Sequence, residues 1–591
     1  MHRKWLAGAA AAIAFPAIAL AAQQARIEPG QPPITERTRA TAGPMSETQR
    51  SVRFDKADLA IEVFPGRQRI EGVATLDLTI QSPLRSLTLD LDRNYSVTAI
   101  SVNGRALASG QWSNPDGRLR IRLPRRARAG ERLSLRIAYG GTPHVAVRAP
   151  WDGGIVWSTT ADGAPFVATA HQLQGCDLLW PCFDHPQAEP ALADIHITVP
   201  PGLSAPANGV PQGVRTLADG RRTFDWRVKR PNTYAINLNI APYDVIRGSY
   251  RSRYGNLIPM EYWYLPDRPD EARRLFAEFA PTLDFFESVI GPYPFGDEKV
   301  GVAQTPHMGM EHQTMNGYGA NYRRDAFGFD SLFHHEFSHE WFANQLTNAD
   351  ADDMWLHEGF GTYMQPLYAE WRGGDPAYHA RLFDLRSGIR NCFPIVSGTS
   401  RTVEQVYLPA TGPSGDIYSK AAWVLHTLRG LIGDEAFFTA TRRLVYGRPD
   451  PRPGNFQPRF GSTDEFVRIV NEEAGRDLGW FFDVYLRRAE LPELVSETRE
   501  GTLRLRWRAP GRGAFPLPVE VRVGERIETV AMTGGSGTLA VPDGAHVVLD
   551  PRGRILRRSA DIEALQRWQY EQARRSPQPG QPAPQPPCIP D

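Results

Sequence analysis

The sequence has 591 residues, and its 67 Lys and Arg nearly balance its 66 Asp and Glu, which leaves a net charge of +1. This balance argues against a general nucleic-acid-binding protein, because such proteins carry a marked positive excess. The length predicts three or four domains, and the hydrophobic content of 41% is ordinary for a globular protein.

The N-terminus has the pattern of a targeting segment. Residues 2–4 are His-Arg-Lys, residues 5–20 are apolar and rich in Ala, and residues 19–21 form a small-x-small cleavage signal. A membrane anchor is the alternative, but the run is short for a span and no stop-transfer pattern follows. We therefore predict a signal peptide over residues 1–22, export to the periplasm or beyond, and no stable membrane span in the mature form.

Composition and periodicity then divide the rest of the chain. Residues 23–48 are polar and rich in Pro, Thr and Arg, which predicts a disordered lead-in. Residues 49–250 alternate apolar and polar side chains between turn signals, which predicts an N-terminal β domain. The clearest strand patterns are 57–64, 72–80 and 119–123, and the clearest hairpin turns are Asn103-Gly104 and Asp219-Gly220.

The period becomes helical in the region 251–490. Strand patterns with Gly-rich turns return over 491–557 and predict a small β-sandwich, followed by a helix at 558–574. The remainder, 575–591, is Pro-rich and is predicted to be disordered. The predicted helices of the central region are 270–280, 329–344, 354–371, 380–390, 417–431, 434–445 and 463–485.

The four cysteines allow three full disulfide pairings, and export would permit them. Cys176 and Cys182 are close enough in sequence to pair, although two buried free thiols explain them equally well. Cys588 lies in the Pro-rich tail and has no obvious partner. No pair of cysteines has the spacing of a zinc knuckle.

The most informative motif is His335-Glu336-Phe337-Ser338-His339, followed after 18 residues by Glu358. Histidines four residues apart lie on one face of a helix, so both imidazoles can reach one metal ion. Glu358 can supply the third protein ligand. Two histidines and one carboxylate leave a fourth position open, which is the pattern of a catalytic zinc site. The sequence therefore predicts one Zn²⁺ per chain.

Glu336 lies between the two histidines and is the expected general base. Zinc lowers the pKa of its water toward about 7, and a carboxylate beside it can accept the proton and pass it to a leaving nitrogen. A helix with two histidines by chance is the alternative explanation, and Glu358 argues against it. His334 is about 100° round the helix from His335 and should not reach the metal. His357 is expected to pack or form a hydrogen bond.

Taken together, these motifs resemble the gluzincin aminopeptidases, the family of aminopeptidase N and leukotriene hydrolase, over residues 50–555. The resemblance implies an α+β multidomain fold, with an N-terminal β-sheet domain, a thermolysin-like α-rich catalytic domain and a small C-terminal β-sandwich. It also implies zinc-dependent hydrolysis of the N-terminal bond of peptides that have a free N-terminus.

Met308-Gly309-Met310-Glu311-His312 resembles the family's Gly-x-Met-Glu-Asn segment, an edge strand that runs along the substrate. The resemblance implies that Glu311 binds the α-amino group, with Gly309 and Met310 beside the substrate. An ammonium in a partly dry site needs an anionic partner. The chain departs from the family pattern at Met308 and His312, which puts the shape of the first subsite in doubt. A surface glutamate is the alternative for Glu311.

Two further site residues rest on the resemblance. A Pro-Cys-Phe-Asp-x-Pro-like segment at 181–186 follows Gln172 and Gln174, and in the family a Gln or Glu at this place helps to bind the amine. Gln172 fits the spacing without a gap, and Gln174 is the fallback. Tyr418 in Tyr-Ser-Lys-Ala matches the family's Tyr-x-Lys-Gly/Ala segment and would donate its hydroxyl to the developing oxyanion.

Two other functions remain open to the sequence. A thermolysin-like endopeptidase shares the zinc pattern, but Glu311 and the preceding β domain argue against it. A non-catalytic zinc-binding protein would need neither Glu336 nor Tyr418. Many family members end in a large helical domain that covers the site, and here a small sandwich and one helix are expected instead. The preferred N-terminal residue and the oligomeric state stay open.

Overall fold

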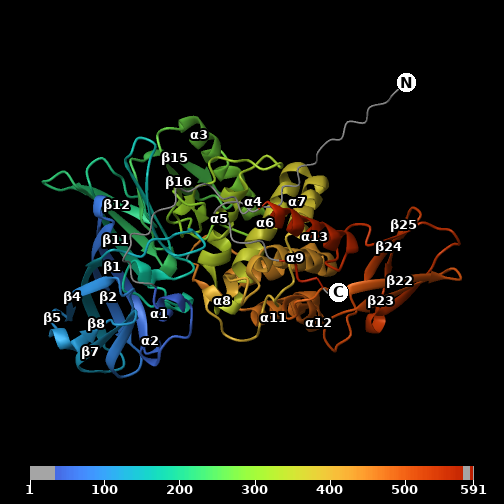
Figure 1. Cartoon of the computed structure of the whole chain (residues 1–591), viewed down its shortest axis with the longest axis horizontal. Coiled ribbons are helices and arrows are strands. Elements are labelled where there is room, and N and C mark those ends of the chain that lie inside the picture. The colour runs from blue at the N-terminus through green and yellow to red at the C-terminus, as the bar shows by residue number, and fades with distance from the viewer. Residues whose placement is uncertain (1–33, 455, 577–585, 590–591) are drawn as a thin grey trace.

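The structure is a computed structural model that describes residues 34–454, 456–576 and 586–589. The predicted signal peptide, 1–22, lies outside these ranges, as do 23–33 of the predicted lead-in and most of the Pro-rich tail. Figure 1 shows a β domain at one end of the molecule, a helical region in the middle and a small β unit at the other end. No helix within the described ranges has both the length and the apolar character needed to cross a bilayer.

The N-terminal β domain is built on an eight-stranded sheet of order β12-β13-β11-β1-β2-β8-β4-β5. The alternation of apolar and polar residues along the strands explains this sheet. In β2 every second residue is buried, so one face of the strand packs on the core. Two three-stranded sheets, β3-β7-β6 and β14-β10-β9, complete the domain. The strands are β1 Val52–Phe64, β2 Arg69–Ile80, β3 Leu84–Asp90, β4 Tyr95–Val102, β5 Arg105–Ala106, β6 Trp112–Ser113, β7 Arg118–Ala127, β8 Arg132–Gly141, β9 Gly154–Thr159, β10 Pro165–Ala170, β11 Leu192–Val199, β12 Val210–Thr216, β13 Arg222–Lys229 and β14 Asn239–Ile240.

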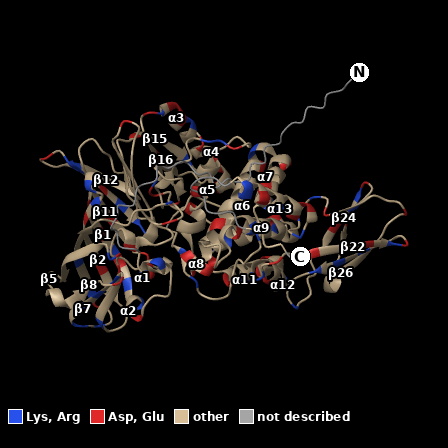
Figure 2. Ribbon diagram, viewed as in Figure 1, with Lys and Arg blue, Asp and Glu red and all other residues tan. Residues whose placement is uncertain are grey.

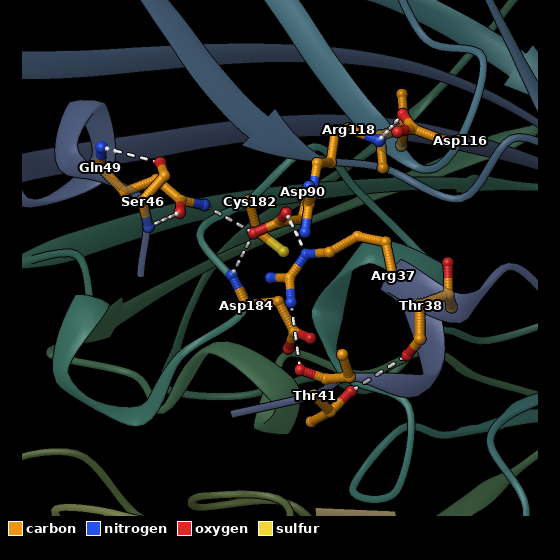
Figure 3. A network of polar contacts seen from close by, with 12 residues as sticks. Arg37, Thr38, Thr41, Ser46, Gln49, Asp90, Asp116, Arg118, Cys182 and Asp184 are labelled. Carbon is orange, nitrogen blue, oxygen red and sulfur yellow. Dashed lines mark hydrogen bonds and ion pairs between the residues drawn. The ribbon is translucent and has the colours of Figure 1, made fainter. Parts of the chain in front are cut away.

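The prediction of a disordered lead-in over residues 23–48 is wrong for its described part. Residues 34–51, here called the N-terminal arm, contain two short capped helices, α1 (Glu36–Arg39) and α2 (Glu47–Arg50). Arg37 Nε lies 2.8 Å from Asp90 Oδ1, and Gln49 Nε2 donates to Asp90 Oδ2 at 2.7 Å (Figure 3). Because Asp90 is buried, its carboxylate needs these partners. The polar composition of residues 23–48 gave no sign of this pairing.

A disulfide joins Cys176 to Cys182, which decides between the two alternatives for this pair. The pair lies beside the arm, since Cys182 exchanges two backbone hydrogen bonds with Asp90. The Asp184 backbone N–H also donates to Asp90 Oδ2, at 3.1 Å. The arm and the segment 182–184, between β10 and β11, are therefore fixed to the same carboxylate (Figure 3).

A five-stranded sheet of order β15-β16-β17-β19-β18 opens the catalytic region. Its first strand begins at Asp244, so the boundary between the two units lies near residue 243, slightly before the predicted 250. The strand β18 lies at the edge of the sheet, as the resemblance implied for this segment. The strands are β15 Asp244–Arg251, β16 Leu257–Tyr264, β17 Val300–Gln304, β18 Gly309–Met310 and β19 Asn316–Tyr318.

Helices form the rest of the catalytic region, and two predicted helices are divided. The predicted helix 463–485 breaks at Gly475, whose φ of 63° is the left-handed conformation that glycine adopts at little cost. The predicted helix 329–344 ends early, as described below. The helices are α3 Pro269–Phe276, α4 Phe279–Val289, α5 Ser331–Ser338, α6 Trp355–Gly373, α7 Asp375–Ser387, α8 Val403–Tyr407, α9 Ser419–Ile432, α10 Asp434–Tyr446, α11 Thr463–Ala474 and α12 Gly479–Leu486, and the short parallel pair is β20 Leu346–Asn348 with β21 Arg459–Gly461.

The C-terminal unit consists of two three-stranded sheets, β22-β23-β26 and β25-β24-β27, in the region predicted to be a sandwich. A disulfide joins Cys588, for which the sequence offered no obvious partner, to Cys392. Sequence could not reveal this pair because 196 residues separate the two cysteines. The elements are β22 Glu493–Arg499, β23 Thr502–Arg508, β24 Val519–Val523, β25 Arg526–Val530, β26 Ser536–Ala540, β27 Val547–Leu549 and α13 Ala560–Arg575.

Charged residues of both signs are interspersed along the ribbon in the view of Figure 2. Many of them pair at the surface, for example Arg125 with Glu131 and Arg443 with Glu472. Exposed pairs of this kind contribute little to stability. The mixture of both signs along the ribbon agrees with the near-zero net charge.

Candidate metal centre

Helix α5 presents both histidines of the motif to one point. Asp330 caps the helix, since its side chain accepts a hydrogen bond from the Phe333 backbone N–H at 3.0 Å. After Ser338 the helix gives way to a single π turn, η6 (Glu340–Gln345), in which Phe342 leaves helical geometry. Irregular turns of this kind are frequent at functional sites. The predicted helix 329–344 is therefore interrupted one turn after the metal motif.

The irregular turn has a direct role in the geometry of His339. The Nδ1 atom of His339 lies 2.9 Å from the Phe342 carbonyl oxygen. A carbonyl can only accept, so Nδ1 carries the proton and the lone pair of Nε2 points away from the turn. The break in the helix thus fixes the tautomer that a metal ligand requires.

Helix α6 brings Glu358 to the two histidines because two glycines, Gly359 and Gly361, follow that residue closely. A Cβ at Gly361 would lie 2.7 Å from Ser338 Oγ and 3.2 Å from His339 Cε1. A Cβ at Gly359 would lie 2.5 Å from the Cβ of Ala421 in α9. Side chains at these two positions would force α6 away from α5 and α9, and with it the Glu358 carboxylate.

The three predicted ligands converge. His335 Nε2 and His339 Nε2 lie 3.2 Å apart, and each lies 3.4 Å from Glu358 Oε2. A tetrahedral zinc ion with bonds of about 2.0–2.1 Å separates its ligand atoms by about 3.3–3.4 Å. Within the described residues this is the one group of three or more His, Cys, Asp or Glu residues whose ligand atoms meet so closely. The donor set fits Zn²⁺.

The electrostatics of the three residues favour a cation. Burial alone would raise the pKa of Glu358, but the imidazoles of His335 and His339 hold this pKa well below its usual range. Burial alone would lower the pKa of His339, but the Glu358 carboxylate raises it to about 10. The same negative field that attracts a proton to the buried imidazole would attract a divalent ion in its place.

Glu336 lies on the same side of the site as the edge strand β18. A Cβ at Gly309 would clash with Glu336 Oε1, so glycine at this position leaves room for the carboxylate. Burial raises the pKa of Glu336 well above its ordinary value, and the charge of Glu311 acts in the same direction. A carboxylate in such surroundings has the increased basicity that suits it to accept a proton.

Glu311 lies in a buried polar pocket next to the ligands. Its Oε1 accepts hydrogen bonds from Gln172 Nε2 at 2.6 Å and from the Tyr234 hydroxyl at 2.7 Å, and its backbone carbonyl accepts one from Asn344. Burial raises the pKa of Glu311. Gln172 Nε2 also lies 3.5 Å from Glu358 Oε1, so one side-chain amide connects this pocket to the metal ligands.

The two glutamines of the β domain have different places. Gln174 is directed elsewhere, because its Oε1 accepts a hydrogen bond from the Gly153 backbone N–H. Gln172 is the glutamine that reaches the site. Met310 is buried directly before Glu311, in the edge strand β18.

Tyr418 lies over the other side of the ligands, directly before α9. Its ring centroid is 5.9 Å from that of His335, and its hydroxyl is 3.4 Å from the hydroxyl of Tyr407. Burial, reinforced by the charge of Glu358, raises the pKa of Tyr418 well above its ordinary value. The hydroxyl therefore stays protonated and can act as a hydrogen-bond donor.

Sequence reasoning missed three polar side chains of the site. Tyr234 and Asn344 hold Glu311, and Tyr407 donates a hydrogen bond to Glu358 Oε1. None belongs to a spaced motif, because each enters from a different loop or short element. The two neighbouring histidines take no part: His334 stacks on Tyr368, and His357 accepts a hydrogen bond from the Asn348 N–H.

Comparison with known proteins agrees with this geometry. Residues 280–485 match the family model described as the peptidase family M1 domain. Aminopeptidase B of Homo sapiens is 27% identical over 319 residues, which cover 51% of this chain and 46% of that protein. Aminopeptidase N of Lactococcus lactis subsp. lactis is 24% identical over 277 residues, which cover 41% of this chain and 31% of that protein.

Solved structures extend the likeness beyond the family model. A two-domain M1 zinc metallopeptidase mutant bound to L-tryptophan has a TM-score of 0.64 and 26% identity, and the match covers 76% of this chain and 98% of that one. The M1 zinc metallopeptidase from Deinococcus radiodurans has a TM-score of 0.61 and 26% identity, over 75% and 96% of the two chains.

The fold is thus similar to that of M1 zinc metallopeptidases, and the His-His-Glu group is suited to hold a metal ion. Residues 280–485 resemble the catalytic domain of peptidase family M1. The chain spans about half the length (46%) of the first curated relatives that it matches.

Proposed function

We propose that this protein is a zinc-dependent aminopeptidase that hydrolyses the first peptide bond of substrates with a free N-terminus. His335, His339 and Glu358 are the metal ligands. When bound, zinc would supply an electrophile for the substrate carbonyl and lower the pKa of a water molecule. The aminopeptidases among the relatives support this assignment.

The protein's own side chains then divide the work. Glu336 accepts the proton of the attacking water and returns it to the leaving nitrogen. Tyr418 donates its hydroxyl to the carbonyl oxygen as negative charge develops there. Gly309 and Met310, in the edge strand β18, provide backbone alongside the peptide. Glu311 and Gln172 hold the α-amino group.

The observation that carries the proposal is the short path from Glu311 to the metal ligands. Gln172 Nε2 lies 2.6 Å from Glu311 Oε1 and 3.5 Å from Glu358 Oε1. An ammonium held by Glu311 would therefore leave only the first peptide bond within reach of the ligands. An endopeptidase must keep this region open for the residues that precede the cleaved bond. The uncharged backbone of those residues would leave a buried carboxylate without a cationic partner, which is energetically costly.

We expect Glu311→Gln to raise the KM for a free-amine peptide about 10- to 100-fold, because a charge-assisted hydrogen bond contributes about 1.5–3 kcal/mol. The amide keeps the size of the carboxylate and removes its charge. Steady-state kinetics on one peptide measure the effect, with Glu497→Gln in the exposed part of β22 as the control. An unchanged KM would exclude Glu311 as the amine-binding residue.

We expect Tyr418→Phe to lower kcat about 100- to 1,000-fold, the usual effect of removing one oxyanion donor. KM and zinc content should stay near those of the unmodified protein, since the ring remains and only the hydroxyl is lost. The matched control is Tyr485→Phe. The Tyr485 hydroxyl is also buried, but it donates to the backbone carbonyl of Leu556 and not to a residue of the site. Equal kcat values for the two variants would remove Tyr418 from the mechanism.

The proposal includes export, with cleavage of the signal peptide over residues 1–22 and a periplasmic or secreted mature protein. The two disulfides support an oxidising compartment, where such bonds persist. Mass spectrometry of the mature N-terminus tests this directly. A first residue near position 23 agrees with the proposal, and an intact N-terminus would contradict it.

A further inference from the structure

The short helix α8 places one unassigned side chain, Tyr407, against the metal ligands. The Tyr407 hydroxyl donates to Glu358 Oε1, the carboxylate oxygen that does not face the histidines. The Tyr418 hydroxyl lies 3.4 Å from the Tyr407 hydroxyl. One phenol therefore contacts both the carboxylate ligand and the side chain assigned to the oxyanion.

We propose that Tyr407 is a positioning residue: it fixes the rotation of the Glu358 carboxylate toward the metal and holds Tyr418 beside it. The inference rests on the proposed function, because it takes Glu358 as a ligand. When one carboxylate oxygen accepts a hydrogen bond from a hydroxyl, the other oxygen is directed toward the metal. Mutation of such a hydrogen-bond partner of a ligand typically lowers metal affinity about 10- to 100-fold.

Helix α8 is fixed to the start of α6, which carries Glu358. Arg401 Nε lies 2.5 Å from Asp352 Oδ1, and both side chains are nearly buried. Asp352 also accepts hydrogen bonds from the backbone N–H groups of Ser397 and Gly398, at 3.0 and 2.8 Å. Because Asp352 lies three residues before Trp355, the first residue of α6, the two elements cannot separate without breaking the buried Arg401–Asp352 pair.

The N-terminal arm holds the same helix from the other side. The Val403 N–H, at the first position of α8, donates to the Thr41 carbonyl at 3.1 Å. Arg37 of the arm pairs with Asp90 of the β domain, as Figure 3 shows. The buried side chains of Ala42 and Val403 line one small cavity together with Gln172 and Tyr234. The position of Tyr407 therefore depends on contacts with both main domains.

The test is the rate at which zinc leaves the full-length protein when a chelator is in excess, measured with a zinc-sensitive dye. We expect Tyr407→Phe to release zinc about 10-fold faster and to lower kcat while KM changes less than twofold. Tyr418→Phe should lower kcat without changing zinc release. Tyr485→Phe, the matched control, should change neither quantity.

A second variant covers the case in which Tyr407→Phe does not fold. Arg401→Gln breaks the pair with Asp352 without touching the ligands, and we expect it to release zinc faster too. Zinc release and kcat of Tyr407→Phe within twofold of the unmodified protein would overturn the inference. If the unmodified protein neither retains zinc nor cleaves peptides, the proposed function fails instead, so the two failures are distinguishable.

Discussion

Replacing Glu336 by glutamine is expected to lower kcat about 1,000-fold, within the range of about 100- to 10,000-fold that general acid–base catalysis contributes. Glutamine has the same shape and fits the space that Gly309 leaves. Its amide cannot accept the proton of the attacking water. Substrate binding and zinc content should remain, because Glu336 is not one of the converging ligands.

Steady-state kinetics and metal analysis of Glu336→Gln measure this prediction on the same sample. The control is Glu370→Gln, on the C-terminal part of α6, where Glu370 lies 3.5 Å from Arg429 at the helix surface. It should retain nearly full activity. A kcat within tenfold of the unmodified protein for Glu336→Gln would remove Glu336 as the base.

Replacing His339 by alanine is expected to weaken zinc binding more than about 100-fold. This exceeds the usual effect of losing a residue that only forms a hydrogen bond to a ligand. His339 is buried, and its Nε2 lies 3.2 Å from His335 Nε2 and 3.4 Å from Glu358 Oε2, so no neighbouring group can replace it. Activity should fall with the metal content. Equilibrium dialysis against buffered zinc measures the affinity.

Thermal unfolding gives a second reading of the same change. Zinc at 100 times its Kd stabilises the folded state by about 2.7 kcal/mol, so the Tm of the unmodified protein should rise when zinc is added to the metal-free form. His339→Ala should lose this rise. The control His379→Ala, at an exposed position of α7, should keep it. A normal zinc-dependent rise in His339→Ala would show that His339 is not a ligand.

The parts of the site that the sequence could predict are those set by local geometry. His335 and His339 are one helical turn apart, so their convergence follows from the period of the helix. The spacing of Glu358 from the two histidines predicted it as the third ligand, and the glycines that follow it explain how α6 comes close enough to α5. The different periods of the sequence predicted a β domain, a helical region and a second β region, and the elements of the structure follow one another in this order.

The parts that the sequence could not predict depend on contacts between distant segments. Tyr234, Asn344 and Tyr407 reach the site from separate elements, and no spacing connects them to the histidines. The N-terminal arm has a polar composition, yet a buried carboxylate in the β domain holds it in place. The disulfide to Cys588 likewise depends on how the chain returns to the catalytic region.

The central claim is tested most directly with one short peptide, offered with a free amine and with an acetylated amine, with and without a zinc chelator. Mass spectrometry of the products identifies the bond that is cleaved. The account predicts release of the first residue from the free-amine form only, and loss of this release with the chelator. Internal cleavage of both forms would contradict it and indicate an endopeptidase.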